Sequence, residues 1–262
     1  MTVHFFKYHG TGNDFILVDD REDNIRFSEQ QIKKLCDRRF GIGADGLILL
    51  KDLPGVDFKM VYFNADGKES SMCGNGGRCI TSFSKRIGKI KTQATFSAID
   101  GIHKSFITGE SPTVVKLQMG DVHEIESGVE FVYLNTGSPH VVIFTDDVAA
   151  VDVIAEGKKI RYGGRFREKG VNVNFVQTSG IGLIVRTYER GVEDETLSCG
   201  TGVIASALAA INENKLEAGK TVVDIQTLGG KLKVYCEKNG SGFNNIWLEG
   251  ETVFVFRGEV EV

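Results

Sequence analysis

The chain repeats itself at half its length. Cys73 and Cys199 each enter a glycine-rich turn, and Tyr62 and Tyr188 precede them at the same distance. Chance rarely keeps so many matches in register, so the sequence predicts two copies of one domain, the second opening near Gly120. A chain of 262 residues is long enough for two domains of ordinary size, each with its own core. The other matches keep an offset of 126 to 129 residues: Glu69 with Glu195, Gly74 and Gly76 with Gly200 and Gly202, Gly10 with Gly137, Asp19 and Asp20 with Asp146 and Asp147, and Arg38, Gly41 and Ile42 with Arg167, Gly170 and Val171.

The composition argues against several classes of protein. The net charge of −4, with both signs interleaved, argues against a nucleic-acid-binding surface. No apolar run approaches the roughly 18 residues of a membrane span, and the N-terminus lacks a signal-peptide core. We therefore expect a soluble cytoplasmic protein. The five cysteines are odd in number and suggest no disulfide framework: Cys36, Cys73, Cys79, Cys199 and Cys236.

The local patterns predict a strand-rich α+β fold with one core helix per copy. Apolar residues recur at helical spacing after Cys73 and again after Cys199, where the segment is apolar nearly all round and should be buried. A capping box at residues 28–31 predicts a short helix that buries Cys36, and a weak helix is predicted at 148–160. The irregular alternation argues against a parallel sheet. Strands are predicted at 3–9, 15–19, 47–50, 57–63, 131–135, 141–145, 171–177, 182–188, 222–227, 231–236, 245–248 and 252–257, with further short runs between 93 and 119.

The chemistry suggested by the sequence centres on Cys73 and Cys199. A cysteine at a helix start lies at the positive end of the helix dipole, which favours the thiolate. The unpaired N–H groups of the same turn can hold a carboxylate. Two such turns, face to face across a cleft between the copies, would suit racemisation of an amino acid, with one thiolate and one thiol on opposite sides of Cα. Such a site requires neither a metal nor a pyridoxal cofactor.

Other interpretations of single motifs have less support. No G-x-G-x-x-G sequence opens a helix, which argues against a dinucleotide site. Cys73 and Cys79 lack the C-x-x-C spacing of a zinc site. His140 is interpreted as a structural hydrogen-bonding residue before a base, with a supporting role near a cysteine left open. Cys36, Cys79 and Cys236 are expected in the core.

Seven segments occur in one order along nearly the whole chain: His9-Gly-Thr-Gly-Asn-Asp-Phe15, Arg39-Phe-Gly-Ile-Gly-Ala-Asp45, Phe63-Asn-Ala-Asp-Gly67, Cys73-Gly-Asn-Gly-Gly-Arg-Cys79, Asn172-Val173, Tyr188-Glu-Arg-Gly191 and Cys199-Gly-Thr-Gly202. Together they resemble the diaminopimelate epimerase family, cofactor-independent enzymes of lysine biosynthesis. The resemblance implies two pseudo-symmetric domains, each a barrel-like mixed sheet around a central helix, with the active site in the cleft between them. It implies that the C-terminal strand crosses back to the first domain, which gives domains at 1–117 plus 251–262 and at 118–250. It also implies a homodimer.

The resemblance assigns roles to matching residues. Cys73 and Cys199 resemble the two acid–base cysteines that convert LL- to meso-diaminopimelate. Two departures from the family pattern concern Ser138, where many relatives have asparagine, and Gly46, where some have glutamine. Ser138 and His140 are expected to support the site. The main-chain N–H groups of Gly74, Asn75, Gly200 and Thr201 resemble those that bind the reacting carboxylate, and Asn13, Asn64, Asn172, Glu189 and Arg190 resemble the set that orients the substrate.

Three alternatives remain open at this point. A cofactor-independent racemase of the proline or hydroxyproline type could use the same scaffold, although the segments around Asn13 and Arg190 argue against it. A phenazine-pathway-like isomerase shares such folds but lacks the cysteine pair. A non-catalytic dithiol protein, redox-active or ligand-binding, could use the same two sulfurs.

Overall fold

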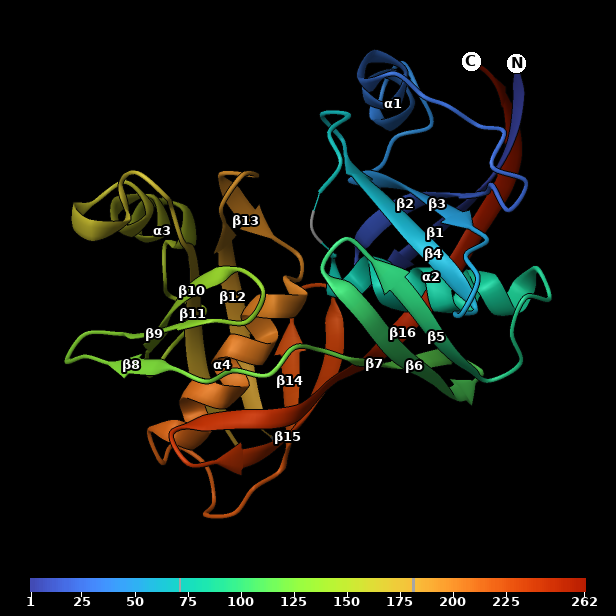
Figure 1. The fold of residues 1–262 in the computed structure, drawn as a ribbon. Coiled ribbons are helices and arrows are strands. Elements are labelled where there is room, and N and C mark those ends of the chain that lie inside the picture. Colours follow the sequence, from blue (N-terminus) through green and yellow to red (C-terminus); the bar gives the residue numbers. More distant parts are fainter. Residues whose placement is uncertain (71, 181) are drawn as a thin grey trace. The chain divides into compact units, whose positions relative to one another are not determined.

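The computed structural model describes residues 1–70, 72–180 and 182–262, and the chain divides into two compact units (Figure 1). Unit 1 consists of Met1–Leu117 and Gly250–Val262, and unit 2 consists of Gln118–Glu249. Each unit holds a mixed sheet and one long buried helix. In the described residues no helix is long and apolar enough to cross a membrane.

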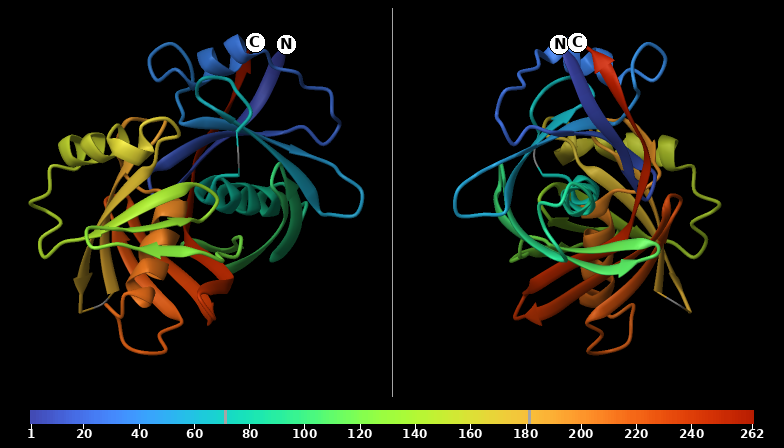
Figure 2. Two further views of the ribbon diagram at one scale, coloured as in Figure 1. Left: turned by 60° about the vertical axis from the view of Figure 1, so that its left-hand side comes forward. Right: turned by 90° about the vertical axis from the view of Figure 1, so that its right-hand side faces the viewer.

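The strands of unit 1 close around helix α2 (Gly74–Arg86), which Figure 2 shows end-on in its right-hand view. Each strand pairs with the next in order, and β1 also pairs with the last one, so the ring has no free edge. Cys79, Ile80 and Phe83 of α2 are fully buried inside it. The order is β1 (Thr2–Gly10), β2 (Asn13–Asp19), β3 (Gly46–Lys51), β4 (Phe58–Asn64), β5 (Gln93–Ala98), β6 (Gly101–Glu110), β7 (Thr113–Gln118) and β16 (Gly242–Glu261).

Helix α1 (Glu29–Cys36) covers a second apolar cluster of unit 1. The predicted capping box is confirmed, because the Ser28 hydroxyl accepts from the backbone N–H of Gln31 and the Gln31 side chain accepts from that of Ser28. Ile32, Leu35 and Cys36 face the cluster and are buried, as the spacing predicted.

The sheet of unit 2 wraps helix α4 (Gly200–Asn212), which contacts β9 to β12, β14 and β15. Nearly every residue of α4 from Gly200 to Ala210 is buried, which confirms the prediction drawn from its apolar sequence. Helix α3 (Val153–Arg161) and the 3₁₀ turn η1 (Gly164–Phe166) precede β11. The strands are β8 (Ile125–Ser127), β9 (Val132–Asn135), β10 (Pro139–Phe144), β11 (Asn172–Ser179), β12 (Gly182–Glu189), β13 (Asp194–Thr196), β14 (Val222–Thr227), β15 (Gly230–Asn239) and the first part of β16.

The two units repeat the same architecture, which confirms the internal repeat. In both, two strands, a short helix and two further strands precede the core helix, and three strands follow it; unit 2 adds β8 before this series and β13 before its core helix. α2 and α4 have 13 residues each. Both sheets are mixed, with β2–β3 and β4–β5 parallel in unit 1 and β10–β11 and β12–β14 parallel in unit 2.

The structure corrects three local predictions. The runs 245–248 and 252–257 belong to one strand of 20 residues, β16, because Gly250 continues the strand instead of ending it. Helix α3 begins at Val153, not at 148, since Asp152 caps it by accepting from the N–H of Ala155. The acidic loop before Cys199 contains the short strand β13, and β8 was not predicted.

Candidate active-site halves

Each of the two predicted catalytic cysteines is the N-cap residue of a core helix. Cys73 precedes α2 with φ −103° and ψ 126°, and Cys199 precedes α4 with φ −109° and ψ 111°. Neither side chain caps its own helix. The N–H groups of a helix's first turn point toward its N-terminal end, so in both units they face the side of the helix on which an anion beside the sulfur would bind. We call Cys73 with its neighbours half-site 1, in unit 1, and Cys199 with its neighbours half-site 2, in unit 2.

Half-site 1 is built on a chain of side-chain amides. Asn13, at the start of β2, donates from Nδ2 to Asp45 Oδ2 at 2.6 Å, and this contact turns Asn13 Oδ1 toward α2. Asn13 Oδ1 accepts from Asn75 Nδ2 at 3.2 Å and from Cys73 Sγ at 3.6 Å. Asn75, 1% exposed, in turn accepts at Oδ1 from Arg78 Nη2 at 2.9 Å. The structure thus brings Asn13, Asn75 and Cys73 together.

Four charged side chains support this amide chain. Arg38 Nη2 lies 2.7 Å from Asp45 Oδ1 and from Asp14 Oδ1, and Lys7 Nζ lies 2.7 Å from Asp14 Oδ2. Burial alone would raise the pKa of Asp14, but hydrogen bonds from Arg38 and Lys7 outweigh it and lower the pKa to about 2. Asp45 thereby has a fixed position from which to orient Asn13.

Asn64 and Gly46 lie on strands next to Asp45, which Gly46 directly follows in the sequence. They face each other in the β3–β4 pair, and the Asn64 side chain is exposed at the end of β4. A Cβ added at Gly46 would lie 2.5 Å from the ring of Tyr62 and from the carbonyl oxygen of Phe63. Tyr62 therefore occupies the space that a longer side chain at position 46 would need.

Half-site 2 links Cys199 to a buried histidine through one hydroxyl. Cys199 Sγ lies 3.5 Å from Thr201 Oγ1, which lies 2.9 Å from His140 Nε2. The other ring nitrogen, Nδ1, accepts from Asn174 Nδ2 at 3.1 Å. The amide orientation of Asn174 is determined by Val141, whose carbonyl accepts from the same Nδ2 at 3.0 Å.

These contacts determine the tautomer of His140. Burial, together with the positive charge of Arg190, lowers the pKa of His140 to about 3, so the ring is neutral at neutral pH. Because the amide nitrogen of Asn174 can only donate to Nδ1, this contact favours the tautomer with the proton on Nε2, which can then donate to Thr201 Oγ1. The hydroxyl proton of Thr201 is then free to point toward Cys199. His140 is fully buried and bonded, as expected of a structural residue, and it is connected to a cysteine.

A second group in half-site 2 joins three of the predicted residues. Asn172 Nδ2 donates to Ser138 Oγ at 3.2 Å, and Asn172 Oδ1 accepts from the backbone N–H of Arg190 at 2.8 Å. Arg190 Nη2 also donates to Ser138 Oγ, at 3.3 Å. Ser138 thus bonds to both neighbours in spite of its short side chain. Glu189 accepts at Oε2 from Thr196 at 2.9 Å on the adjacent β13.

Among the residues of these networks that sequence reasoning missed are Arg78, Asp45 and Asn174. Arg78 and Asp45 fall inside quoted motifs, so their position was visible although their contacts were not. Asn174 lies two residues after Asn172 on β11 and therefore on the same face of that strand. The two-residue spacing from Asn172 was therefore the feature of the sequence that could have identified Asn174.

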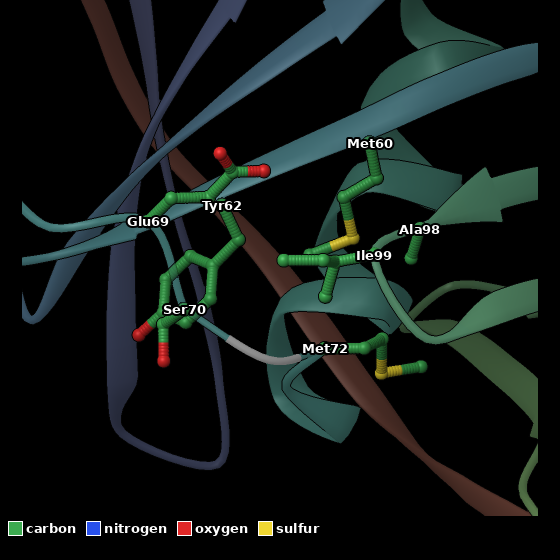
Figure 3. A pocket seen from close by; sticks show the side chains of 7 residues that line it. All are labelled: Met60, Tyr62, Glu69, Ser70, Met72, Ala98 and Ile99. Atoms are coloured by element: carbon green, nitrogen blue, oxygen red, sulfur yellow. The ribbon is translucent and has the colours of Figure 1, made fainter.

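Unit 1 also contains a small pocket with its own set of lining residues. Figure 3 shows the thioethers of Met60 and Met72 beside Ile99 on its apolar side, with Glu69 and Ser70 also lining it. None of its lining residues belongs to the predicted site. Its lining combines apolar side chains with polar ones, and we assign it no role.

Sequence comparison assigns the chain to a known group of enzymes. The family profile described as "Diaminopimelate epimerase" matches residues 5–125 and 132–255. A diaminopimelate epimerase from Flavobacterium psychrophilum is 51% identical over 256 residues, covering 97% of this chain and 98% of that protein. Another, from Chlorobaculum tepidum, is 39% identical over 263 residues, covering 96% and 98%.

Solved structures share the fold at low sequence identity. A hydroxyproline epimerase from Agrobacterium vitis matches with a TM-score of 0.76 at 13% identity, over 99% of this chain and 92% of that chain. A phenazine biosynthesis protein of the PhzF family from Bacillus anthracis matches with a TM-score of 0.75 at 15% identity, over 100% of both chains. These matches concern the fold, and they confirm the predicted class of two similar α+β domains.

Proposed function

The chain belongs to the diaminopimelate epimerase family and is an isomerase, and from that premise we propose that it interconverts LL- and meso-diaminopimelate by acid–base catalysis at two cysteines. The observation that carries the proposal is the matched placement of Cys73 and Cys199 as N-cap residues of the two core helices. Units 1 and 2 are, in this proposal, the two epimerase domains, each supplying one sulfur.

The reaction removes the proton from Cα on one face and returns a proton on the other. One cysteine acts as a thiolate and takes the proton, and the second acts as a thiol and delivers its own. The sulfurs must therefore reach opposite faces of one carbon. The Thr201 hydroxyl supports this role for Cys199, because its proton can be donated to a thiolate. Asn13 Oδ1 supports it for Cys73, because it accepts from the thiol and orients it.

The carbanion spreads its charge into the α-carboxylate, which the helix N-termini can hold. We assign this role to the N–H groups of Gly74, Asn75, Gly200 and Thr201. Donors aimed at developing charge in a water-excluded site are worth about 2.7–4 kcal/mol each. Stabilisation by fixed N–H groups makes a pyridoxal cofactor or a metal ion unnecessary for this chemistry.

The remaining polar residues are assigned to orientation of the substrate. Arg190, held by the Lys169 carbonyl at 3.0 Å and by Ser138, can bind a carboxylate. Glu189 and the amide oxygens of Asn64 and Asn172 can accept from ammonium groups. A substrate with two amino and two carboxylate groups needs donors and acceptors of both kinds.

The cellular context is part of the proposal. We assign the enzyme to lysine biosynthesis in the cytoplasm and expect it to act as a homodimer, on the basis of its family. Size-exclusion chromatography with light scattering measures the oligomer, and a monomer at assay concentrations with full activity would contradict that expectation.

Isotope incorporation tests the two-base mechanism. In D2O at early conversion, the inverted product should carry deuterium at the reacting carbon while recovered substrate stays protiated. The reason is that the delivering thiol exchanges with solvent before substrate binds. Chiral chromatography with mass spectrometry measures both isomers. Equal label in substrate and product from the first turnovers would contradict two bases.

Substitution of the cysteines also tests the two-base mechanism. Cys73→Ala and Cys199→Ala should each abolish inversion, since neither face can then complete its transfer. Cys36→Ala, at the buried end of α1, is the matched control and should retain inversion. Robust inversion by either of the first two variants would rule out the mechanism.

A hydroxyproline-type racemase is the second candidate, since a hydroxyproline epimerase shares the fold. Incubation with proline, 4-hydroxyproline and diaminopimelate separates the two. Turnover of the cyclic amino acids alone would favour the second candidate, and no turnover of any of them under reductant would favour a non-catalytic dithiol protein.

A further inference from the structure

Arg78 is a fully buried cation in the core of unit 1. It lies in the second turn of α2 with 0% of its surface exposed. Its Nη1 lies 3.5 Å from the carbonyl oxygen of Gly74, its Nη2 donates to Asn75 Oδ1, and its Nε has no partner among the described residues. A Cβ at Gly10 would lie 3.1 Å from Nη2, so the guanidinium packs directly against the end of β1.

No carboxylate of the described chain forms an ion pair with Arg78. The charged groups nearby balance one another, because Lys7 and Arg38 pair with Asp14 and Asp45. Cys79, the next residue, is no counter-ion, since complete burial raises the pKa of its thiol. Burial lowers the pKa of Arg78 to about 10, so the guanidinium keeps its charge at neutral pH.

Such a charge is costly unless an anion approaches it. Burying an unpaired ion costs several kcal/mol. The helix dipole adds to this cost, because cations are favoured at the C-terminal end of a helix and Arg78 lies near the N-terminal end of α2. The groups that can bring negative charge to this end of the helix are the Cys73 thiolate and a substrate carboxylate bound at the first turn.

We propose that Arg78 is a positioning residue of half-site 1, which orients Asn75 and Asn13 toward Cys73 and supplies the positive charge that favours the Cys73 thiolate. The orienting path runs through side-chain hydrogen bonds: Arg78 donates to Asn75 Oδ1, which leaves Asn75 Nδ2 to donate to Asn13 Oδ1, the acceptor beside Cys73. The proposal rests on the proposed function in taking Cys73 as an acid–base group.

The test measures the titration of one sulfur. In a Cys199→Ala background under reductant, the alkylation rate of Cys73 by iodoacetamide is followed against pH by peptide mass spectrometry. Arg78→Met should raise the thiol pKa of Cys73 by about one unit, which lowers its alkylation rate at neutral pH about tenfold. Arg78→Lys keeps the charge but loses the planar fork, so it should shift the pKa far less.

Arg86→Met is the matched control. Arg86 lies at the other end of α2, where Nε donates to Tyr8 Oη at 2.8 Å, so its loss should affect folding stability without moving the Cys73 titration. In the chain with both cysteines, Arg78→Met should lower kcat at least tenfold. If Arg78→Met does not fold, Arg78→Gln replaces it, because its amide can still donate to Asn75 Oδ1.

An unchanged Cys73 titration in a folded variant without charge at position 78 would overturn the inference. That outcome differs from failure of the proposed function, which would appear as inversion by Cys73→Ala while the titration of Cys73 still responded to position 78.

Discussion

The two cysteines have matching backbones but different hydrogen-bond partners. Cys73 lies beside an acceptor, the Oδ1 of Asn13, whereas Cys199 lies beside a hydroxyl whose oxygen already accepts from His140. A carbonyl oxygen can orient the thiol form of a cysteine, and a hydroxyl can donate to a thiolate. The two sulfurs therefore differ in the hydrogen bonds open to them, and in half-site 1 the proposed effect of the Arg78 charge on the Cys73 thiolate adds to the contact with Asn13.

His140 makes stability depend on pH. Its pKa is about 3 in the folded chain and near 6.5 when unfolded, so the unfolded chain binds more protons between these values. The stabilisation is present above about pH 6.5 and is lost as pH falls toward 3. Urea denaturation should show a falling midpoint from pH 6.5 to 4.5, and His140→Gln should reduce that dependence. If the urea midpoint fell equally steeply with pH in the unchanged protein and in His140→Gln, His140 would not be buried in its neutral form.

At the scale of elements, small residues let the core helices approach the sheets. A Cβ at Gly202 would lie 2.3 Å from Asn174 Oδ1. The Asn174 side chain cannot easily move away, because its Nδ2 donates to the Val141 carbonyl and its Oδ1 accepts from the Thr187 hydroxyl. The glycine in the second cysteine motif is thus required by the position of Asn174 on β11, and through Asn174 it affects His140.

Gly202→Ala should therefore destabilise the chain by about 1–3 kcal/mol through overpacking, although alanine favours a helix by up to about 1 kcal/mol. Denaturant titration measures the loss, and activity should fall because the Asn174–His140 contact shifts. Gly120→Ala is the control, since no atom lies within 4 Å of its added Cβ. Equal stability of the two variants would show that Asn174 can move aside.

At the scale of the whole molecule, β16 belongs to both units. Its residues up to Glu249 lie in unit 2, and those from Gly250 onward lie in unit 1, where Val253 to Glu261 pair with β1. Because β1 closes its ring through this partner, the last thirteen residues of the chain complete the barrel formed by the first 117.

A chain that ends at Glu249 should lose the protection of β1. Hydrogen exchange should become fast in β1, whose residues pair with Val253 to Glu261, and stay slow in β14 and β15. A chain that lacks only Glu261 and Val262 is the control and should keep β1 protected beyond its first residues. Slow exchange of β1 in the shorter chain would mean that unit 1 is stable without closure.

The sequence by itself determined the repeat, the placement of both cysteines at helix starts, the buried character of α4 and the family. Helical periodicity and glycine turns can be read within a few residues of one another, and the repeat and the family follow from matching such short motifs along the chain. The short helix of Ile32, Leu35 and Cys36 belongs to the same class, since its capping box lies within four residues.

Only the tertiary structure decided which polar residues meet. Arg78 is buried because β1 packs against it, and Asn174 meets His140 because β10 and β11 are parallel neighbours. Pairing with other strands of the sheet also keeps β16 continuous through Gly250, where the sequence pattern suggested a break. Burial and partner choice depend on contacts between distant segments, and a single sequence does not specify which strands lie side by side.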